Sequence, residues 1–201
     1  MSIQSDVKVG FIADENVADP DRLVVAARPN TSATMAETTF LGGGARNVTV
    51  TTTGTGDNAK TCTITGTDVF GNSITEVIVS TGSAEAVAGA KLFLTVSGVE
   101  CSAQYAANIT VGSGSLCASA VAGGNRTRMK GYSIVSAGTA GLVDFYNGTP
   151  EDGTIIFKAQ TLGTDNTTID NTIPDEGILF DSGLAISYTV ATVVLANIFF
   201  A

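Results

Sequence analysis

The chain has 201 residues, no histidine, no tryptophan and three cysteines, and 14% of its residues are charged. Its 10 basic and 19 acidic residues give a net charge of −9, which disfavours binding to nucleic acid or to an anionic membrane surface. Without histidine, Ser-His-Asp and Cys-His catalysis and His-ligated zinc are excluded. We therefore expect that the protein is not an enzyme and that it binds no cofactor and no metal.

Residues 1–40 contain two of the four prolines and little alternation of apolar and polar residues beyond residue 12. Val7, Val9 and Phe11 fall on one face of a short predicted strand, and residues 14–39 have the composition of an extended arm. An arm with so little apolar surface does not fold alone. We therefore expect it to lie against its own domain or against a neighbouring subunit.

From Arg46 onward, apolar and polar residues alternate, and turn-forming Gly, Asn and Asp separate the alternating segments, a pattern typical of short β-strands. Predicted strands cover residues 47–53, 60–65, 74–80, 91–97 and 108–111, with a short helical turn at 84–90. A stretch of small residues, 118–128, is interpreted as a linker. Further strands are predicted at 131–136, 141–146, 154–158, 167–170, 177–180, 184–189 and 192–200.

These elements predict an all-β protein with two antiparallel domains of the β-sandwich or jelly-roll type. The predicted boundaries are an extended N-terminal arm at residues 1–40, a first domain at 41–124 and a second domain at 125–201.

The cysteines are odd in number and none lies in a CxxC pair, so the sequence gives no sign of a zinc or redox motif. Cys62 shares strand parity with Ile64, which favours a plain thiol in the core. One disulfide between Cys101 and Cys117 is possible but not needed.

Two other polar patterns have ordinary explanations. The acidic residues between 165 and 181 could offer oxygen ligands to calcium, but they lack the order of an EF-hand, and β-turns also favour Asn and Asp. Residues 1–6 carry a carboxylate where a secretory signal would have lysine and an apolar run, so we expect the chain to stay soluble where it is made.

The run from Arg126 to Lys130, which includes Arg128, is the one basic run in an acidic chain. It is either a solvated linker or a contact with acidic residues. Those acidic residues belong either to a partner or to residues 125–201 of the chain itself. The sequence leaves both readings open.

Residues 46–76, followed by 93–99 and 109–113, resemble a β module of tailed-bacteriophage virion proteins. Residues 131–148 and 173–184 are similar to another module of phage structural proteins. The resemblance implies a structural virion component made in the host cytoplasm. Its leading form is a homotrimeric capsid decoration (cement) protein on the outer capsid surface, with the arm lying across the major capsid protein.

In this hypothesis the partner-binding residues are Val7, Val9, Phe11, Arg22, Arg28, Arg126 and Arg128. One alternative is a tail-associated adaptor or fibre component, which would share the same modules. Another is a carbohydrate-binding adhesin that stacks sugars on Tyr132, Tyr146 and Tyr188.

Overall fold

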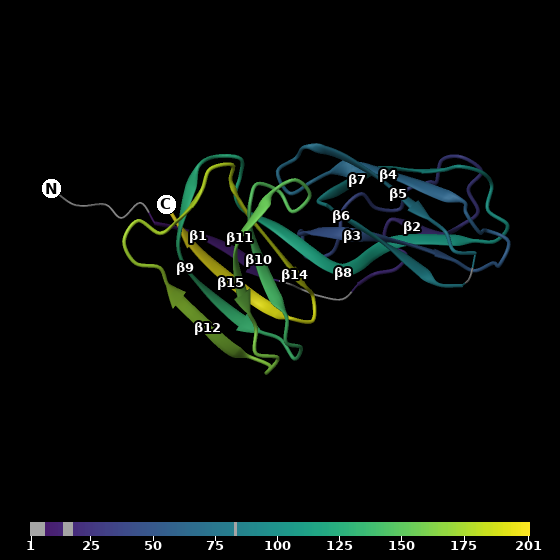
Figure 1. The fold of residues 1–201 in the computed structure, drawn as a ribbon. Coiled ribbons are helices and arrows are strands. Elements are labelled where there is room, and N and C mark those ends of the chain that lie inside the picture. The colour runs from purple at the N-terminus through teal and green to yellow at the C-terminus, as the bar shows by residue number, and fades with distance from the viewer. Residues whose placement is uncertain (1–6, 14–17, 83) are drawn as a thin grey trace. The chain divides into compact units, whose positions relative to one another are not determined.

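The computed structural model describes residues 7–13, 18–82 and 84–201. Within these ranges all regular secondary structure is strand, and no helix occurs (Figure 1). The strands pair antiparallel in several sheets. The predicted all-β, antiparallel class is therefore confirmed.

The chain divides into two compact units, which are described here one at a time. The terminal unit consists of residues 1–15 and 118–201, and the inserted unit consists of residues 16–117. Strand β8 (Ile109–Ala122) begins in the inserted unit and ends in the terminal unit. The terminal unit is thus built from both ends of the chain.

This division differs from the predicted boundaries of 1–40, 41–124 and 125–201. The described residues of the predicted arm do not form a separate part: β1 (Lys8–Ala13) is a strand of the terminal unit, and residues 18–40 belong to the inserted unit. Leu23, Val24 and Phe40 are buried in the core of the inserted unit. The few apolar residues of this segment complete a core that other strands supply, which the sequence pattern alone does not reveal.

The inserted unit has two sheets around one apolar core. Its strands are β2 (Val24–Ala27), β3 (Ala45–Thr52), β4 (Thr61–Thr67), β5 (Ser73–Val79), β6 (Ala86–Phe93), β7 (Thr95–Cys101) and the first part of β8. One sheet has the order β5-β4-β7, and in the other β3 lies between β8 and β6 while β2 pairs with β8. Ile64 on β4, Phe93 on β6 and Ile109 on β8 meet in this core and are fully buried.

Strand β4 shows the predicted alternation of buried and half-buried residues. Cys62 and Ile64 are fully buried, while the four threonines of the strand are half-buried on its other face. Strand β6, in contrast, replaces the helical turn predicted at residues 84–90. Ala86 and Val87 pair with Thr51 and Val50 of β3, so hydrogen bonding to a neighbouring strand outweighs a weak local helical preference.

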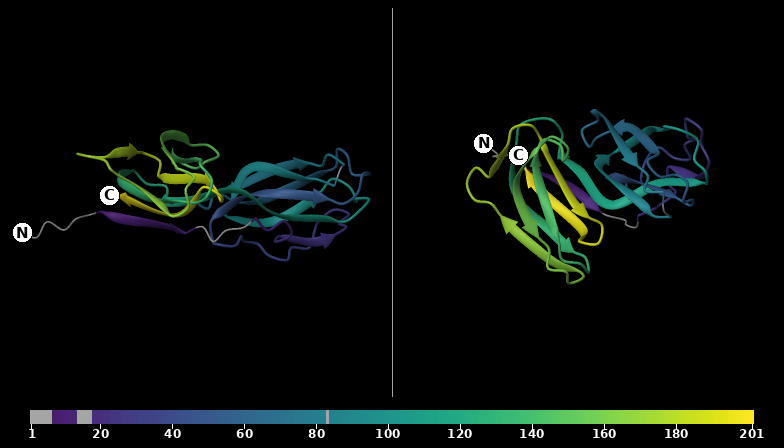
Figure 2. Two further views of the ribbon diagram at one scale, coloured as in Figure 1. Left: turned by 90° about the horizontal axis from the view of Figure 1, so that it is seen from below. Right: turned by 45° about the vertical axis from the view of Figure 1, so that its right-hand side comes forward.

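The terminal unit also contains two layers of strands. Besides β1 and the end of β8, its strands are β9 (Thr127–Ser136), β10 (Leu142–Asn147), β11 (Thr154–Gln160), β12 (Thr167–Thr172), β13 (Ile178–Phe180), β14 (Leu184–Thr189) and β15 (Val193–Phe200). One sheet has the order β1-β15-β9-β12, with β13 also paired to β9, and the other contains β11-β10-β14. Both views of Figure 2 show β1 beside β15, the first and last strands of the chain.

An aromatic cluster lies in the core of the terminal unit. The rings of Tyr132, Phe145 and Phe157 have centroid separations of 5.4–5.9 Å and tilted or edge-on contacts, the arrangement that aromatic pairs prefer. Ile134, Ile186 and Ile198 are fully buried as well.

The predicted linker at residues 118–128 is shorter than expected. Strand β8 continues to Ala122 and β9 begins at Thr127, which leaves residues 123–126 as the connection. Gly124 has a positive φ of 58° there, a conformation that glycine adopts without strain. Alanine and serine also occur in strands, so the small-residue composition predicted the start of the linker, at residue 118, too early.

Candidate contact surfaces

Strand β1 presents an apolar face to solvent. Val9 is 54% exposed and Phe11 67% exposed, and Val7, which precedes the strand, is exposed on the same parity. Ile12, on the opposite parity, is buried, and a side chain at Gly10 would meet the side chain of Val121. The strand therefore packs one face inward and turns the predicted contact residues outward.

The register with β15 widens this apolar surface. Val9 lies opposite Phe199 and Phe11 opposite Asn197, and directly opposed residues of an antiparallel pair share a face. Phe199 and Leu195 are half-buried on this face. We call Val7, Val9, Phe11, Leu195 and Phe199 the β1 face.

Strand β1 also stands at the end of its sheet, and no other described strand pairs with its outer edge. An edge strand offers backbone N–H and C=O groups to an incoming strand, and proteins commonly protect such edges with charge or with proline. The only charged side chain of β1 is Lys8. The β1 face thus combines exposed apolar side chains with an accessible sheet edge.

The first two predicted arginines make contacts within the chain. The Nε of Arg22 donates to the carbonyl of Thr39 at 3.3 Å, and its guanidinium lies 3.9 Å from the carboxylate of Glu37. The Nε of Arg28 donates to the carbonyl of Tyr105 at 2.6 Å. Arg28 therefore ties residues 18–40 to the loop that follows β7, whereas both contacts of Arg22 lie within residues 18–40.

Arg126 and Arg128 reach acidic residues of the chain itself. Arg126 lies 3.5 Å from Asp181, and Arg128 lies 3.1 Å from Glu176. Both arginines therefore lie beside acidic residues of the chain's own residues 125–201. The side chains of Arg126 and Asp181 are both 65% exposed, while that of Arg128 is 29% exposed and that of its partner Glu176 is 81% exposed. Water screens such pairs, so each stabilises the fold only weakly.

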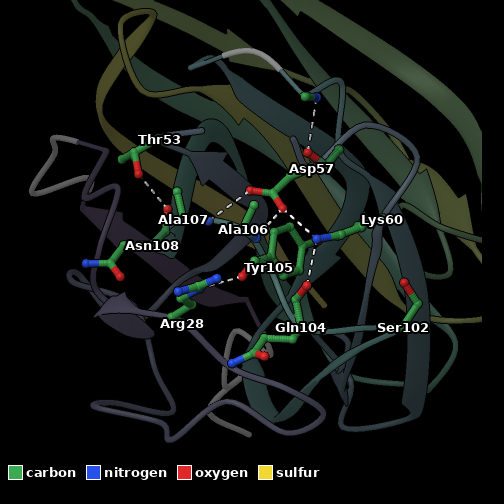
Figure 3. A network of polar contacts seen from close by, with 12 residues as sticks. Arg28, Thr53, Asp57, Lys60, Ser102, Gln104, Tyr105, Ala106, Ala107 and Asn108 are labelled. Carbon is green, nitrogen blue, oxygen red and sulfur yellow. Dashed lines mark hydrogen bonds and ion pairs between the residues drawn. The ribbon is translucent and has the colours of Figure 1, made fainter. Parts of the chain in front are cut away.

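A buried carboxylate organises one end of the inserted unit (Figure 3). Asp57, which is fully buried, accepts hydrogen bonds from the backbone N–H groups of Ala106 at 2.6 Å and Ala107 at 3.4 Å. Lys60 donates to the same carboxylate at 2.8 Å and to the carbonyl of Gln104 at 2.6 Å. The network therefore fastens the β3–β4 turn to the loop that follows β7.

The charge state of Asp57 follows from these partners. Burial raises the pKa of Asp57, but the hydrogen bonds from Ala106, Lys60 and Ala107 together outweigh it and hold this pKa below the ordinary value of an aspartate. The carboxylate is therefore charged at neutral pH. Because its partners come from the β3–β4 turn and from the loop after β7, this carboxylate acts as a clamp between them.

Beneath this clamp lies a cluster of sulfur and hydroxyl groups. Tyr105 is fully buried, with the ammonium of Lys60 5.4 Å from its ring centroid. The Sγ of Cys62 lies 3.2 Å from the hydroxyl of Tyr105 and 3.7 Å from the Sγ of Cys101. Cys62 and Cys101 are paired across β4 and β7, whereas Cys117 lies on β8, and all three thiols are free.

The sulfur contacts shift the ionisation of this cluster. The hydrogen bond from Cys101 lowers the pKa of Cys62 against the opposing effect of burial, and the Tyr105 hydroxyl adds to that lowering. The same Cys62–Cys101 contact raises the pKa of Cys101, and burial raises that of Tyr105. Cys62 is therefore the first of the three groups to lose its proton.

Two of the tyrosines considered as sugar platforms are buried. Tyr132 belongs to the aromatic cluster and Tyr188 is almost fully enclosed, while Tyr146 is half-buried and its hydroxyl accepts a hydrogen bond from Ser187. Stacking on a sugar needs an exposed ring face. Tyr132 and Tyr188 do not offer one.

Within the described ranges, no group of three or more Cys, Asp or Glu side chains is arranged to hold a metal ion. None of the described residues forms a helix that is long and apolar enough to cross a membrane. Searches among protein-family models, curated proteins and solved structures found no match to this chain.

Proposed function

We propose that this chain is a non-enzymatic structural protein of a bacteriophage virion that decorates and stabilises the capsid by binding the major capsid protein. The observation that carries the proposal is the β1 face, whose Val9 and Phe11 are more than half exposed on an edge strand. It joins the resemblance to modules of phage structural proteins, which covers residues 46–76, 93–99 and 109–113 for one module and 131–148 and 173–184 for the other. Small soluble monomers seldom leave such side chains together on an unpaired edge unless another surface covers them.

The net charge supports the same assignment. With 19 acidic against 10 basic residues, most of the surface repels other acidic surfaces and stays hydrated, which suits exposure on the outside of a particle. Contact would then rest on apolar burial at the β1 face. The described arginines of the predicted contact set are already bonded to groups of the chain itself.

The size of the effect can be worked from exposure. Fully burying a valine or phenylalanine side chain contributes about 1.5–3 kcal/mol. Val9 and Phe11 have about half to two thirds of that surface still to bury, so together they contribute about 2–3 kcal/mol, or roughly 30- to 150-fold in affinity.

The test is co-sedimentation of the full chain with capsids, free of this protein, of the phage that encodes it. The variant combines Val9→Ser with Phe11→Ser, and we expect its affinity to fall by the factor given above. Substitution is preferred to deletion of residues 1–40, because Leu23, Val24 and Phe40 are part of a core.

Leu162→Ser is the matched control, because Leu162 is 63% exposed, in the same unit, and lies outside the β1 face. It should leave binding unchanged. Undiminished binding by a folded Val9→Ser, Phe11→Ser variant would count against the β1 face as the contact. Failure of the unaltered chain to bind capsids would count against the function itself.

The proposal extends to the homotrimer and to the class of the two units. We propose that both units are antiparallel sandwiches of the jelly-roll kind, supported by the core shared between the two sheets of the inserted unit. Light scattering should give a mass three times that of the chain. Copy number separates decoration from the tail alternative: hundreds of copies per particle fit a decoration protein, and about a dozen or fewer fit a tail adaptor or fibre.

A further inference from the structure

We propose that Cys62 and Cys101 form an oxidation site, at which a peroxide-class oxidant converts the two thiols into a disulfide that joins β4 to β7. This inference is independent of the proposed function, because it rests on the interior of the inserted unit alone. It also differs from the disulfide considered from the sequence, in which Cys101 would pair with Cys117.

The strand register places the two cysteines directly opposite each other. Cys62 pairs with Cys101 between Thr63, opposite Glu100, and Thr61, whose carbonyl accepts from the N–H of Ser102. The N–H of Cys101 points the other way and donates to the carbonyl of Thr31. Cys62 and Cys101 therefore form a non-hydrogen-bonded pair, the narrow kind in an antiparallel ladder.

The narrow pair suits a disulfide. Its Cα atoms are expected about 4.5 Å apart, which falls at the short end of the range of about 4.4–6.8 Å spanned by disulfides. The two Sγ atoms already lie 3.7 Å apart on the same face of the sheet, so side-chain rotation closes most of the remaining distance. The third cysteine, Cys117, lies on β8 and its thiol contacts the carbonyl of Ser115.

The surroundings favour Cys62 as the attacking sulfur. It contacts both the Cys101 thiol and the Tyr105 hydroxyl, which can each donate to a thiolate, and its pKa is lowered accordingly. Cys62 is fully buried and Cys101 is 8% exposed. This enclosure selects a small neutral oxidant such as hydrogen peroxide over a bulky disulfide.

The reaction balances in two steps. The Cys62 thiolate attacks one oxygen of hydrogen peroxide, the O–O bond breaks, and a sulfenic acid and hydroxide form. The Cys101 thiol then attacks the Cys62 sulfur, the S–S bond forms, and water leaves with the proton of Cys101. The hydroxide takes up the proton that Cys62 released on ionising. In total the two sulfurs lose two electrons, and peroxide is reduced to two molecules of water.

The bond would close a long loop. The cysteines are 39 positions apart, and this loop contains β5 and β6 as well as the connections between them. A cross-link of that span restricts the unfolded chain, so oxidation should raise the free energy of unfolding in urea, and a reductant should reverse the change.

The test uses the full chain carrying Cys117→Ser, reduced and then treated with hydrogen peroxide. Unfolding in guanidinium with N-ethylmaleimide then counts the free thiols by intact mass. We expect two adducts before peroxide, none after it, and two again after dithiothreitol. Trypsin cleaves after Lys60, Lys91 and Arg126, so a non-reduced link between residues 61–91 and 92–126 identifies the Cys62–Cys101 bond.

The matched control is Cys101→Ser, which keeps Cys62 and Cys117 and should retain both adducts or gain only oxygen. Two adducts in peroxide-treated Cys117→Ser, or added oxygen without the cross-linked peptide, would overturn the proposal. If Cys117→Ser fails to fold, the unaltered chain serves instead: its adducts should fall from three to one. Chymotryptic cleavage after Tyr105 then separates Cys101 from Cys117 and shows which of them is linked.

Discussion

Replacing Asp57 with alanine tests whether the buried carboxylate is the clamp of the inserted unit. The change removes the acceptor for the N–H groups of Ala106 and Ala107 and for the ammonium of Lys60. Lys60 is partly exposed and keeps its bond to Gln104, so it can rehydrate. The two backbone N–H groups are left without this partner inside the protein.

The magnitude follows from these lost contacts. Loss of a hydrogen bond to a charged group costs about 1.5–3 kcal/mol, and loss of one partner of a buried ion pair costs about 3–5 kcal/mol. Ala106 is exposed and Ala107 half-buried, so water replaces part of what their N–H groups lose. Because Lys60 recovers part of its hydration, we expect Asp57→Ala to lower the free energy of unfolding of the inserted unit by about 3 kcal/mol.

Two measurements at neutral pH check this expectation. Urea unfolding gives the change in the free energy of unfolding, and amide hydrogen exchange should become faster at Ala106 and Ala107. Asp21→Ala is the control, because Asp21 is an exposed acid of the same unit and should change stability by less than about 0.5 kcal/mol. A loss below about 1 kcal/mol, with unchanged exchange at both amides, would refute the clamp.

The dependence on pH supplies a second check of the same residue. The pKa of Asp57 in the folded chain is lowered, so the folded state favours the carboxylate more than the unfolded state does. Its contribution is therefore complete above the unfolded pKa of about 4 and declines as the pH falls below that value through the folded pKa. The difference in stability between the unaltered chain and Asp57→Ala should be largest near pH 7 and shrink toward pH 2–3.

Two further substitutions probe packing and surface charge. Gly66→Ala should destabilise the inserted unit by more than about 2 kcal/mol in urea unfolding, because the added methyl group meets a backbone carbonyl of β7 and the ring of Phe93. Gly98→Ala is the control and should be neutral, because no atom lies within 4 Å of the added methyl group. Equal effects of the two substitutions would contradict this packing. Replacing Arg126 and Arg128 with serine should change the free energy of unfolding by less than about 1 kcal/mol, because the acidic partner in each ion pair is largely exposed and water screens the pair. A larger loss of unfolding free energy would show that these ion pairs stabilise the fold. Loss of capsid binding without loss of stability would show that the two arginines contact the capsid.

Strand content followed from sequence because period-2 alternation is a local property. Strand β4 shows this directly, since the parity of Cys62 and Ile64 against the threonines matches the buried and half-buried faces. At residues 84–90 and 118–122 the local composition was ambiguous, and pairing with distant strands decided the outcome. The position of residues 18–40 likewise depends on packing against a core that residues of other strands form.

The clamp and the cysteine pair were beyond the reach of local patterns. Asp57 lies in a Gly- and Asn-rich stretch that indicates only a turn, and its backbone partners are 49 and 50 positions away. Cys62 had the parity of a buried residue, but its meeting with Cys101 depends on the register of β4 against β7. The shared face of Val9 and Phe11, by contrast, was predicted from the sequence because it needed only their own strand.

The pairing of β1 with β15 sets an order for folding during synthesis. Lys8 lies opposite Phe200, so the first described strand to leave the ribosome must wait for nearly the whole chain before it finds its partner. Residues 16–117 emerge in one stretch and hold their own core, so they can fold while the rest is still being made. Until β15 has been made, Val9 and Phe11 belong to an unpaired strand, which leaves the nascent terminal unit exposed to aggregation.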